Sequence, residues 1–356
     1  MSIRAALLPP VTLGRHLNKI VLIRILAVAL ALGGLATALD LVESASEVLK
    51  REDGGILRYL GLRVPLILSA VLPVALILGP VLAFLSLSGR SEFTILRASG
   101  ATTYRLLFML TPVALVIGLG LFALNDRIAP KLEGRLLTWL DNRPVGTMGD
   151  FWARTSNGVI HAAASSPSGE LITDVEVYVT DNLGRLTTRI TARAARWLDG
   201  QWVFDEAMRL EPGEGRSVSI EGQVWDTPLR PANVRALASP GRTVGGNVAE
   251  RVLKGDWAGN RTADFYQVRV YRGYAAVLVP FLMILLAAPA AFGTRRGGGL
   301  GKRAALGVAL GFAFLLFDGM LTALGETGNL PPFLAAFGAT AMFAAIGAYI
   351  LISLEE

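Results

Sequence analysis

The feature that most constrains this chain is a set of six long apolar runs. An α-helix needs about 20 predominantly apolar residues to cross the hydrocarbon core of a bilayer. Hydrophobic residues make up 53% of the 356 residues and charged residues only 17%, a balance that a soluble protein of this size does not have. The sequence therefore predicts six membrane-spanning helices. The runs cover residues 20–39, 64–88, 106–124, 273–293, 304–324 and 333–353.

The first run is expected to stay in the protein as a spanning helix. Acidic residues follow it instead of the small residues of a cleavage site, so the pattern does not indicate a signal peptide. Arg24 lies near its start, where a long side chain can extend to the membrane interface. Asp40, Glu43 and Glu47 recur at helical spacing, which predicts that the helix continues past the bilayer. Residues 48–63 are expected to form a loop.

The character of the chain changes between residues 125 and 271, where charges, Gly and Pro replace the apolar runs. Residues 126–146 indicate a helical extension of the third span. Residues 174–179 alternate with period two, and Asn157-Gly158 and Asp199-Gly200 are dipeptides that two-residue hairpin turns prefer. We expect about seven antiparallel strands in an all-β, sandwich or jelly-roll-like domain. Its predicted core includes Trp197, Trp202, Phe204 and Trp225.

Three regions follow from this division. Residues 1–124 hold spans one to three, residues 125–271 hold the β domain and residues 272–356 hold spans four to six. Within the middle region, residues 233–262 are expected to be a linker with a short helix near 247–253. Basic residues in short loops mark the cytoplasmic side of a membrane protein. That rule makes both termini cytoplasmic and the β domain extracytoplasmic, from Arg4, Arg15, Lys19, Arg90, Arg97, Arg105, Arg295, Arg296, Lys302 and Arg303.

The short charged segment between spans two and three, about residues 89–103, is then cytoplasmic. Phe93, Leu96 and Ala98 fall on one helical stripe, while Glu92 and Arg97 point elsewhere. This pattern is typical of an amphipathic helix on a membrane surface that contacts a soluble partner. An ordinary solvated turn explains the same composition.

The sequence offers little material for catalysis or metal binding. It contains no Cys and only two His, His16 and His161, which lie far apart. Residues 297–303 hint at a phosphate-binding loop, but the glycine spacing is wrong and Arg303 stands where a Ser or Thr would hold magnesium. We interpret that segment as a flexible basic turn. No cofactor is expected, and energy for any work must come from a partner.

Asp318 is a single carboxylate inside the fifth span. A charge at mid-membrane costs roughly 2.5–3.5 kcal/mol on insertion scales, so it usually faces protein or a watery cavity. It either lines a cavity, pairs two helices, or is held by a hydroxyl or amide of a neighbouring helix. Pairing with Asp40 as an intramembrane aspartyl protease is conceivable, but nothing else in the sequence supports it.

Four stretches together give the chain a resemblance to the LptF/LptG permease family, and to its LptG branch more than to LptF. This family forms the membrane part of the lipopolysaccharide exporter. The resemblance covers essentially the whole chain, including the order of spans and the inserted β domain. The stretches are Ser91–Gly100, Gly149–Ala153, Phe314–Gly325 and Asn329–Pro332.

The resemblance implies a non-catalytic permease in a Gram-negative inner membrane. An LptB-like ATPase dimer would bind the ATP, and a second, LptF-like permease would complete the membrane part. The 89–103 segment is similar to the coupling helix that docks on the ATPase, and Glu92 matches its acidic residue. The neighbouring positions that match are Ser91, Arg97, Ala98, Ser99 and Gly100.

The resemblance also implies a lipid path. The first and fifth spans would form lateral gates, which makes candidate cavity or gate residues of Arg24, Asp40, Glu43 and Asp318. The β domain would pass lipid through LptC towards LptA-like proteins. Some LptG chains carry lysines suited to lipid A phosphates where this chain has Asp40, Ser46 and Glu47. Cations from another chain, a bridging divalent ion or a less phosphorylated lipid would each explain the difference.

Two other interpretations stay open at this level. One is a membrane-anchored assembly or signalling protein whose β domain binds a partner. The other is a force-transmitting permease of the MacB or FtsX type, although such proteins usually have four spans with the large domain after the first.

Overall fold

The computed structural model describes residues 11–49, 55–89, 92, 102–140, 149–155, 158–181, 183, 185–213, 216–238, 244–291 and 299–355. The chain divides into two compact units. One is helical and comprises Met1–Leu132 with Val268–Glu356, and the other comprises Glu133–Gln267 and contains the strands. The sequence pattern predicts the corresponding boundaries near residues 124 and 271.

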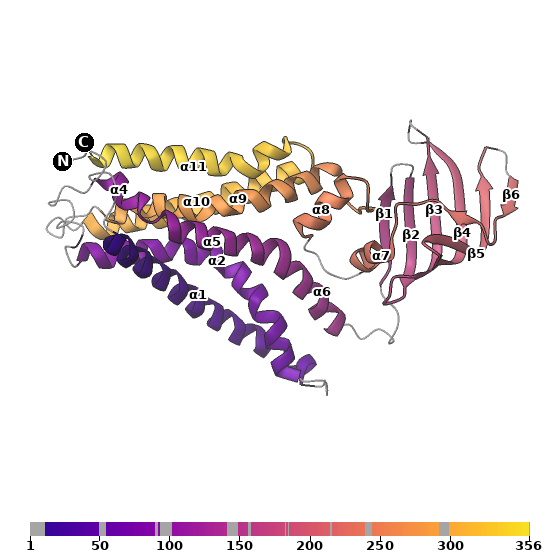
Figure 1. Cartoon of the computed structure of the whole chain (residues 1–356), viewed down its shortest axis with the longest axis horizontal. Helices are drawn as coiled ribbons and strands as arrows, with labels where there is room; N and C mark the ends of the chain where they lie inside the picture. Colours follow the sequence, from indigo (N-terminus) through magenta and orange to yellow (C-terminus); the bar gives the residue numbers. More distant parts are fainter. Residues whose placement is uncertain are drawn as a thin grey trace. The chain divides into compact units, whose positions relative to one another are not determined.

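Six helical stretches of the described residues are long and apolar enough to cross a membrane, as predicted. The first two lie in α1 (Val11–Val48) and α2 (Gly55–Gly89), and the third runs through α5 (Thr111–Phe122), the π-helical turn η2 (Ala123–Ile128) and α6 (Ala129–Leu140). The last three lie in α9 (Ala263–Ala287) with the 3₁₀ turn η3 (Ala288–Ala291), in α10 (Gly299–Glu326) and in α11 (Pro332–Glu355). Figure 1 labels the α-helices, including the short α4 (Thr103–Phe108) that precedes the third span.

Several helices extend beyond the apolar runs. α1 continues to Val48, as the helical spacing of its acidic residues predicts. The loop predicted for residues 48–63 is wrong in its second half, because α2 begins at Gly55. The flexible turn predicted for residues 297–303 is also wrong from Gly299 onward, where α10 begins. Backbone hydrogen bonds in a helix do not require apolar side chains, so hydropathy marks the membrane segment and not the helix end.

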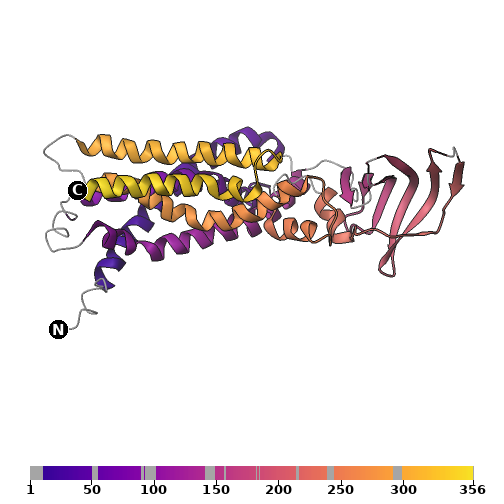
Figure 2. The same cartoon turned by 90° about the horizontal axis from the view of Figure 1, so that it is seen from above.

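Close approach of backbones positions the spanning helices. α1 packs along α2 (Figure 1), and α10 packs along α11 (Figure 2). A Cβ built on Gly79 of α2 would lie 2.5 Å from Ile25 Cγ1 of α1, and one on Gly118 of α5 would lie 2.4 Å from the Val277 carbonyl oxygen of α9. Only glycine fits at such contacts, a common feature of helix pairs in membranes.

The described residues of the second unit contain seven strands, in line with the prediction of about seven. They form one antiparallel sheet in the order β1-β2-β3-β4-β5-β6, with β7 paired to β5. The described strands therefore form a meander, and the second sheet of a sandwich is not among them. The strands are β1 (Phe151–Thr155), β2 (Gly158–Ser165), β3 (Leu171–Thr180), β4 (Leu186–Leu198), β5 (Gln201–Glu211), β6 (Arg216–Ser219) and β7 (Val224–Trp225).

The predicted hairpin at Asp199-Gly200 is confirmed. Both residues have positive φ, 48° and 84°, as a type I′ turn requires, and they join β4 to β5 where Leu198 pairs with Gln201. Asn157 of the other predicted turn lies outside the described residues. Trp202 and Phe204 are buried in the sheet core, whereas Trp197 and Trp225 are half-buried against it.

Two short helices accompany the sheet. The sequence predicts α8 (Gly246–Leu253) but misses α7 (Pro231–Ala238), because the amphipathic pattern of α7 is weaker than that of α8. α7 packs on β1 and β2 and contributes Val234 and Ala238 to the core. Asn233, only 1% exposed, exchanges two hydrogen bonds with the backbone of Ala258 at 2.9 and 3.0 Å. These hydrogen bonds join two parts of the linker, and α7 packs the linker against the sheet.

Candidate functional site

The charge inside the fifth span has a partner of opposite sign. Asp318 of α10 accepts a hydrogen bond from Arg272 of α9, with 2.8 Å between Oδ2 and Nη2. Arg272 also donates to the Thr322 hydroxyl at 2.7 Å, and that hydroxyl donates to the Asp318 carbonyl at 2.6 Å. The side chain of Asp318 is 17% exposed. The three groups form a closed polar network between two spanning helices.

This network chooses among the roles that the sequence leaves open for Asp318. Asp318 pairs α9 with α10, which is one of the expected roles. Its side chain is held by the Arg272 guanidinium and not by a hydroxyl or amide of a neighbouring helix. Sequence reasoning misses Arg272, which stands just before the fourth apolar run. The available signal is that a buried carboxylate usually has a basic partner. Nothing local selects which of the many arginines supplies it.

A second polar cluster joins the C-terminal part of α1 to the N-terminal part of α2. The Arg63 guanidinium donates to both oxygens of Asp40, at 2.5 Å from Nη2 and 3.0 Å from Nε. The hydroxyl of Tyr59, which is buried, donates to Asp40 at 2.5 Å and lies 2.9 Å from the Ser44 hydroxyl. The carboxylate is therefore neutralised within the chain, in the strong forked geometry that arginine allows.

The four candidate cavity or gate residues do not come together in one site. Asp40 and Asp318 bind different arginines, so the conceivable protease pair is wrong. Arg24 and Glu43 are exposed on α1, and neither belongs to the Arg63 or the Arg272 network. Whether any of the four touches a substrate stays a prediction.

One of the six predicted coupling residues lies within the described part of the chain. Glu92 is helical, and its Oε2 lies 3.5 Å from His16 Nε2 of α1. The other predicted coupling residues lie outside the described residues, namely Ser91, Arg97, Ala98, Ser99 and Gly100.

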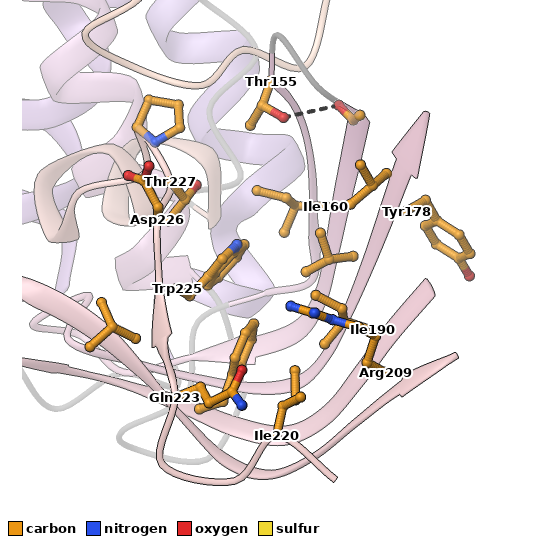
Figure 3. Close-up of a pocket in the computed structure, with 16 residues that line it drawn as sticks. Thr155, Ile160, Tyr178, Ile190, Arg209, Ile220, Gln223, Trp225, Asp226 and Thr227 are labelled. Atoms are coloured by element: carbon orange, nitrogen blue, oxygen red, sulfur yellow. Dashed lines mark hydrogen bonds between the residues drawn. The ribbon is translucent and has the colours of Figure 1, made fainter. Parts of the chain in front are cut away.

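The strand unit contains a cavity of about 330 Å³ on the inner face of its sheet. Ile160, Ile190 and Trp225 point into it from three strands (Figure 3). Asp226 and Thr227 lie on its polar side, whereas Tyr178 points away from it. An apolar floor with a polar margin suits an amphipathic ligand.

The opposite face of the sheet carries charge. The Tyr178 hydroxyl and, at 3.0 Å, the Arg189 guanidinium donate to Glu176. These hydrogen bonds hold the pKa of Glu176 below its ordinary value, the Tyr178 bond contributing most, and the same bond raises the pKa of Tyr178. The alternation along β3 therefore separates the cavity from a solvated, charged surface.

No group of three His, Asp or Glu side chains suited to a metal ion is found in the part of the chain that the structure describes. The carboxylates of Asp40, Glu176 and Asp318 each accept a hydrogen bond from an arginine.

Comparison with known proteins matches the whole arrangement to one family. A sequence model described as "Lipopolysaccharide export system permease LptF/LptG" matches residues 15–353. The lipopolysaccharide export system permease protein LptG of Escherichia coli K12 is 23% identical over 96% of this chain and 98% of its own length. The protein of the same name from Haemophilus influenzae is 20% identical over 92% of this chain and 94% of its own length.

Proposed function

Because the chain belongs to the lipopolysaccharide export system permease family LptF/LptG, we propose that it extracts lipopolysaccharide from the inner membrane as one half of an ABC transporter. The chain is a multi-pass inner-membrane protein, and a permease component instead of an enzyme. The observation that carries the proposal is the family match across all six spans and the inserted β unit.

The proposed energy source is a separate LptB-like ATPase dimer in the cytoplasm. A permease that is driven by a separate ATPase needs a mechanical connection to that partner. We assign that connection to the segment around Glu92, with Ser91, Arg97, Ala98, Ser99 and Gly100 as its further contacts. The distance of 3.5 Å between Glu92 Oε2 and His16 Nε2 supports this assignment, because it brings the segment into contact with α1.

The proposed orientation puts both termini in the cytoplasm and the β unit in the periplasm. The unequal distribution of basic residues supports it. The loop between α10 and α11, from Gly325 to Pro332, contains no Lys or Arg. Lys302 and Arg303, at the other end of α10, are basic. The Asp40–Arg63 cluster then lies near the periplasmic end of the first two spans.

The proposed lipid cavity lies between this chain and a second, LptF-like permease, with α1 and α10 at the lateral gates. The Arg272–Asp318 network supports a gate role for α10, because it joins that helix to α9 through a charged pair inside the span. Arg24, Asp40, Glu43 and Asp318 are the candidate cavity or gate residues. ATP-driven closure of the ATPase would compress this cavity.

Lysines in α1 cannot explain how this chain would recognise lipid A phosphates, because Asp40, Ser46 and Glu47 stand at those positions. Asp40 already accepts hydrogen bonds from Arg63 and Tyr59, which leaves it poorly suited to hold a bridging divalent ion. Its pairing therefore favours cations from elsewhere, or a less phosphorylated lipid. Binding of phosphorylated and dephosphorylated lipid A in the presence and absence of Mg²⁺ separates these hypotheses. If Mg²⁺ strengthened the binding of phosphorylated lipid A, that result would favour the bridging-ion hypothesis after all.

The β unit is proposed to pass lipid to LptC-like and LptA-like periplasmic proteins. The apolar floor of its cavity supports contact with acyl chains. At about 330 Å³ the cavity holds only part of a lipid, so the rest of the molecule would stay outside it.

The test is purification of the tagged chain from its native membranes in mild detergent, with identification of co-purifying proteins and an ATPase assay. We expect an ABC ATPase and a second six-span permease to co-purify. Glu92→Arg should remove the ATPase and its activity. The matched control is Glu221→Arg, a reversal of charge at an exposed position of the β unit, which should leave both unchanged.

A chain that purifies alone and without ATPase activity would contradict the proposal. That result would favour the membrane-anchored protein whose β unit binds a partner. Loss of the ATPase in the Glu221→Arg control as well would show that the effect of Glu92→Arg is not specific to the coupling segment.

A further inference from the structure

The helix that follows the cytoplasmic segment is broken. α4 ends at Phe108 and α5 begins at Thr111, with Met109 and Leu110 between them. Pro112, near the start of α5, has no N–H and cannot bond to the carbonyl four residues earlier. In an unbroken helix the Val113 N–H would instead donate to the Met109 carbonyl. Both groups of that missing bond need partners.

Asn18 of α1 supplies both partners. Its Nδ2 donates to the Met109 carbonyl at 2.6 Å, and its Oδ1 accepts from the Val113 N–H at 3.0 Å. The side-chain amide thus stands in the place of one helical hydrogen bond, a recognised cause of helix breaks. Its second N–H donates to the Gly14 carbonyl of its own helix at 2.6 Å. Three hydrogen bonds therefore fix one side chain between α1 and the break.

The surroundings make this joint tight. Leu17 and Val21, on either side of Asn18 along α1, are buried, and so are Met109 and Val113. Asn18 is itself half-buried among these apolar neighbours, so water competes less for its hydrogen-bond partners than at the surface. The side chain of Asn18 therefore holds α1 against the α4–α5 break.

We propose that Asn18 is a positioning residue that transmits movement of the cytoplasmic coupling segment to the gate helix α1. The inference rests on the proposed function, and adds to it the route by which the work of the ATPase reaches the gate. The segment approaches α1 where Glu92 meets His16, and the helix that follows the segment approaches α1 where the α4–α5 break meets Asn18. Displacement of α4 then pulls on α1 instead of bending the break.

The test uses the purified transporter complex in proteoliposomes. It measures ATP hydrolysis and the release of lipopolysaccharide to a soluble acceptor, and reports the lipid released per ATP. This ratio separates coupling from stability, because a misfolded complex loses both activities together. Asn18→Leu removes every hydrogen bond at similar volume, and Asn18→Gln keeps the amide. Lys19→Met is the matched control, since Lys19 is the exposed neighbour of Asn18.

We expect Asn18→Leu to retain ATP hydrolysis and to lower the lipid released per ATP by about fivefold to tenfold, within the range that single residues give for coupling between sites. Asn18→Gln should recover part of the ratio and Lys19→Met all of it. An unchanged ratio in Asn18→Leu would overturn the inference, as would a parallel loss of both activities. A wild-type complex that hydrolyses ATP but releases no lipid would instead contradict the proposed function.

A covalent link provides an independent measurement at the same joint. A Cβ built on Gly14 lies 3.9 Å from Met109 Cβ, a separation that a disulfide bond spans, and the chain contains no other Cys. Gly14→Cys with Met109→Cys, added to Asn18→Leu, should restore the ratio when oxidised and lose it again when reduced. A formed disulfide that restores nothing would show that Asn18 does not act as a link.

Discussion

Two arginine–carboxylate pairs with nearly the same geometry lie in contrasting parts of this molecule. In the helical unit Arg272 and Asp318 are 2.8 Å apart, with side chains 35% and 17% exposed. In the strand unit Arg193 and Glu206 are 2.9 Å apart, with side chains 73% and 57% exposed. Distance alone does not distinguish them. The difference lies in the solvent that each pair has lost.

The contrast teaches that burial decides what an ion pair contributes. Two charges attract weakly in water, and more strongly where water and protein dipoles cannot screen them. Taking the charges out of water carries a cost of similar size, so a buried pair adds little compared with two apolar side chains. Its partners nevertheless depend on one another, because one buried charge left alone is unfavourable. The exposed pair has no such dependence.

The largest expected effect comes from removing one partner inside the helical unit. Arg272→Met leaves Asp318 without its cation and should destabilise the protein by roughly 3–5 kcal/mol. The measurement is the fraction of monodisperse protein left after heating in detergent. Arg272→Met combined with Asp318→Leu should recover most of the loss, since no charge then lies alone. A double variant as unstable as Arg272→Met would show that the pair itself carries the stability.

An intermediate effect is expected at the α1–α2 cluster, where Asp40 meets two donors. Asp40→Asn removes the charge that Arg63 and Tyr59 share and should cost about 1–3 kcal/mol. Tyr59→Phe removes only one hydrogen bond, with about 0.5–1.5 kcal/mol expected. Limited proteolysis of the α1–α2 connection in detergent compares the two. If Asp40→Asn and the wild type resisted the protease equally, the cluster would contribute as little to stability as an exposed ion pair.

A small effect is expected at the exposed pair of the β unit. A double-mutant cycle with Arg193→Ala and Glu206→Ala should give a coupling energy below about 1 kcal/mol that falls further as salt is added. Tryptophan fluorescence reports this unit selectively, because all six Trp lie in residues 133–267. A coupling energy as large for Arg193–Glu206 as for Arg272–Asp318 would contradict the idea that burial decides what an ion pair contributes. The fluorophores are Trp139, Trp152, Trp197, Trp202, Trp225 and Trp257.

The smallest effect concerns pH. Folding lowers the pKa of Glu176 from its ordinary value of 4.5, chiefly through the Tyr178 hydroxyl and then through Arg189. The ionised form therefore stabilises the fold above that value, and the contribution is lost as the pH falls through the lowered pKa. Glu176→Gln should flatten the decline in stability below about pH 4.5, as followed by tryptophan fluorescence. An unchanged acid decline would contradict the assignment.

Much of the fold could be predicted because its signals are local. Apolar length gives the six spans, and period-two alternation with Asp199-Gly200 gives the strands and one hairpin. Helix ends were less predictable, since α2 and α10 begin in polar sequence. α7 was missed because its eight residues are stabilised by packing on the sheet and carry a weak pattern of their own.

The candidate site divides in the same way. Asp318 and Asp40 stand out in the sequence as carboxylates in or beside apolar runs. Arg272 and Arg63 do not, because basic residues at the ends of spans are common and have another explanation in topology. Asn18 gives no signal at all. Its importance comes from a break in a helix 91 residues further along the chain.

By itself, the sequence determined that this chain spans a membrane six times, carries an inserted β unit and resembles one permease family. Those properties depend on composition and order over short stretches. Only the tertiary structure decided which helices pair and which polar groups meet. A spanning helix is apolar on every side, so its sequence does not say which face meets a neighbour. The contacts of Asn18, Asp40 and Asp318 are fixed by that choice of faces.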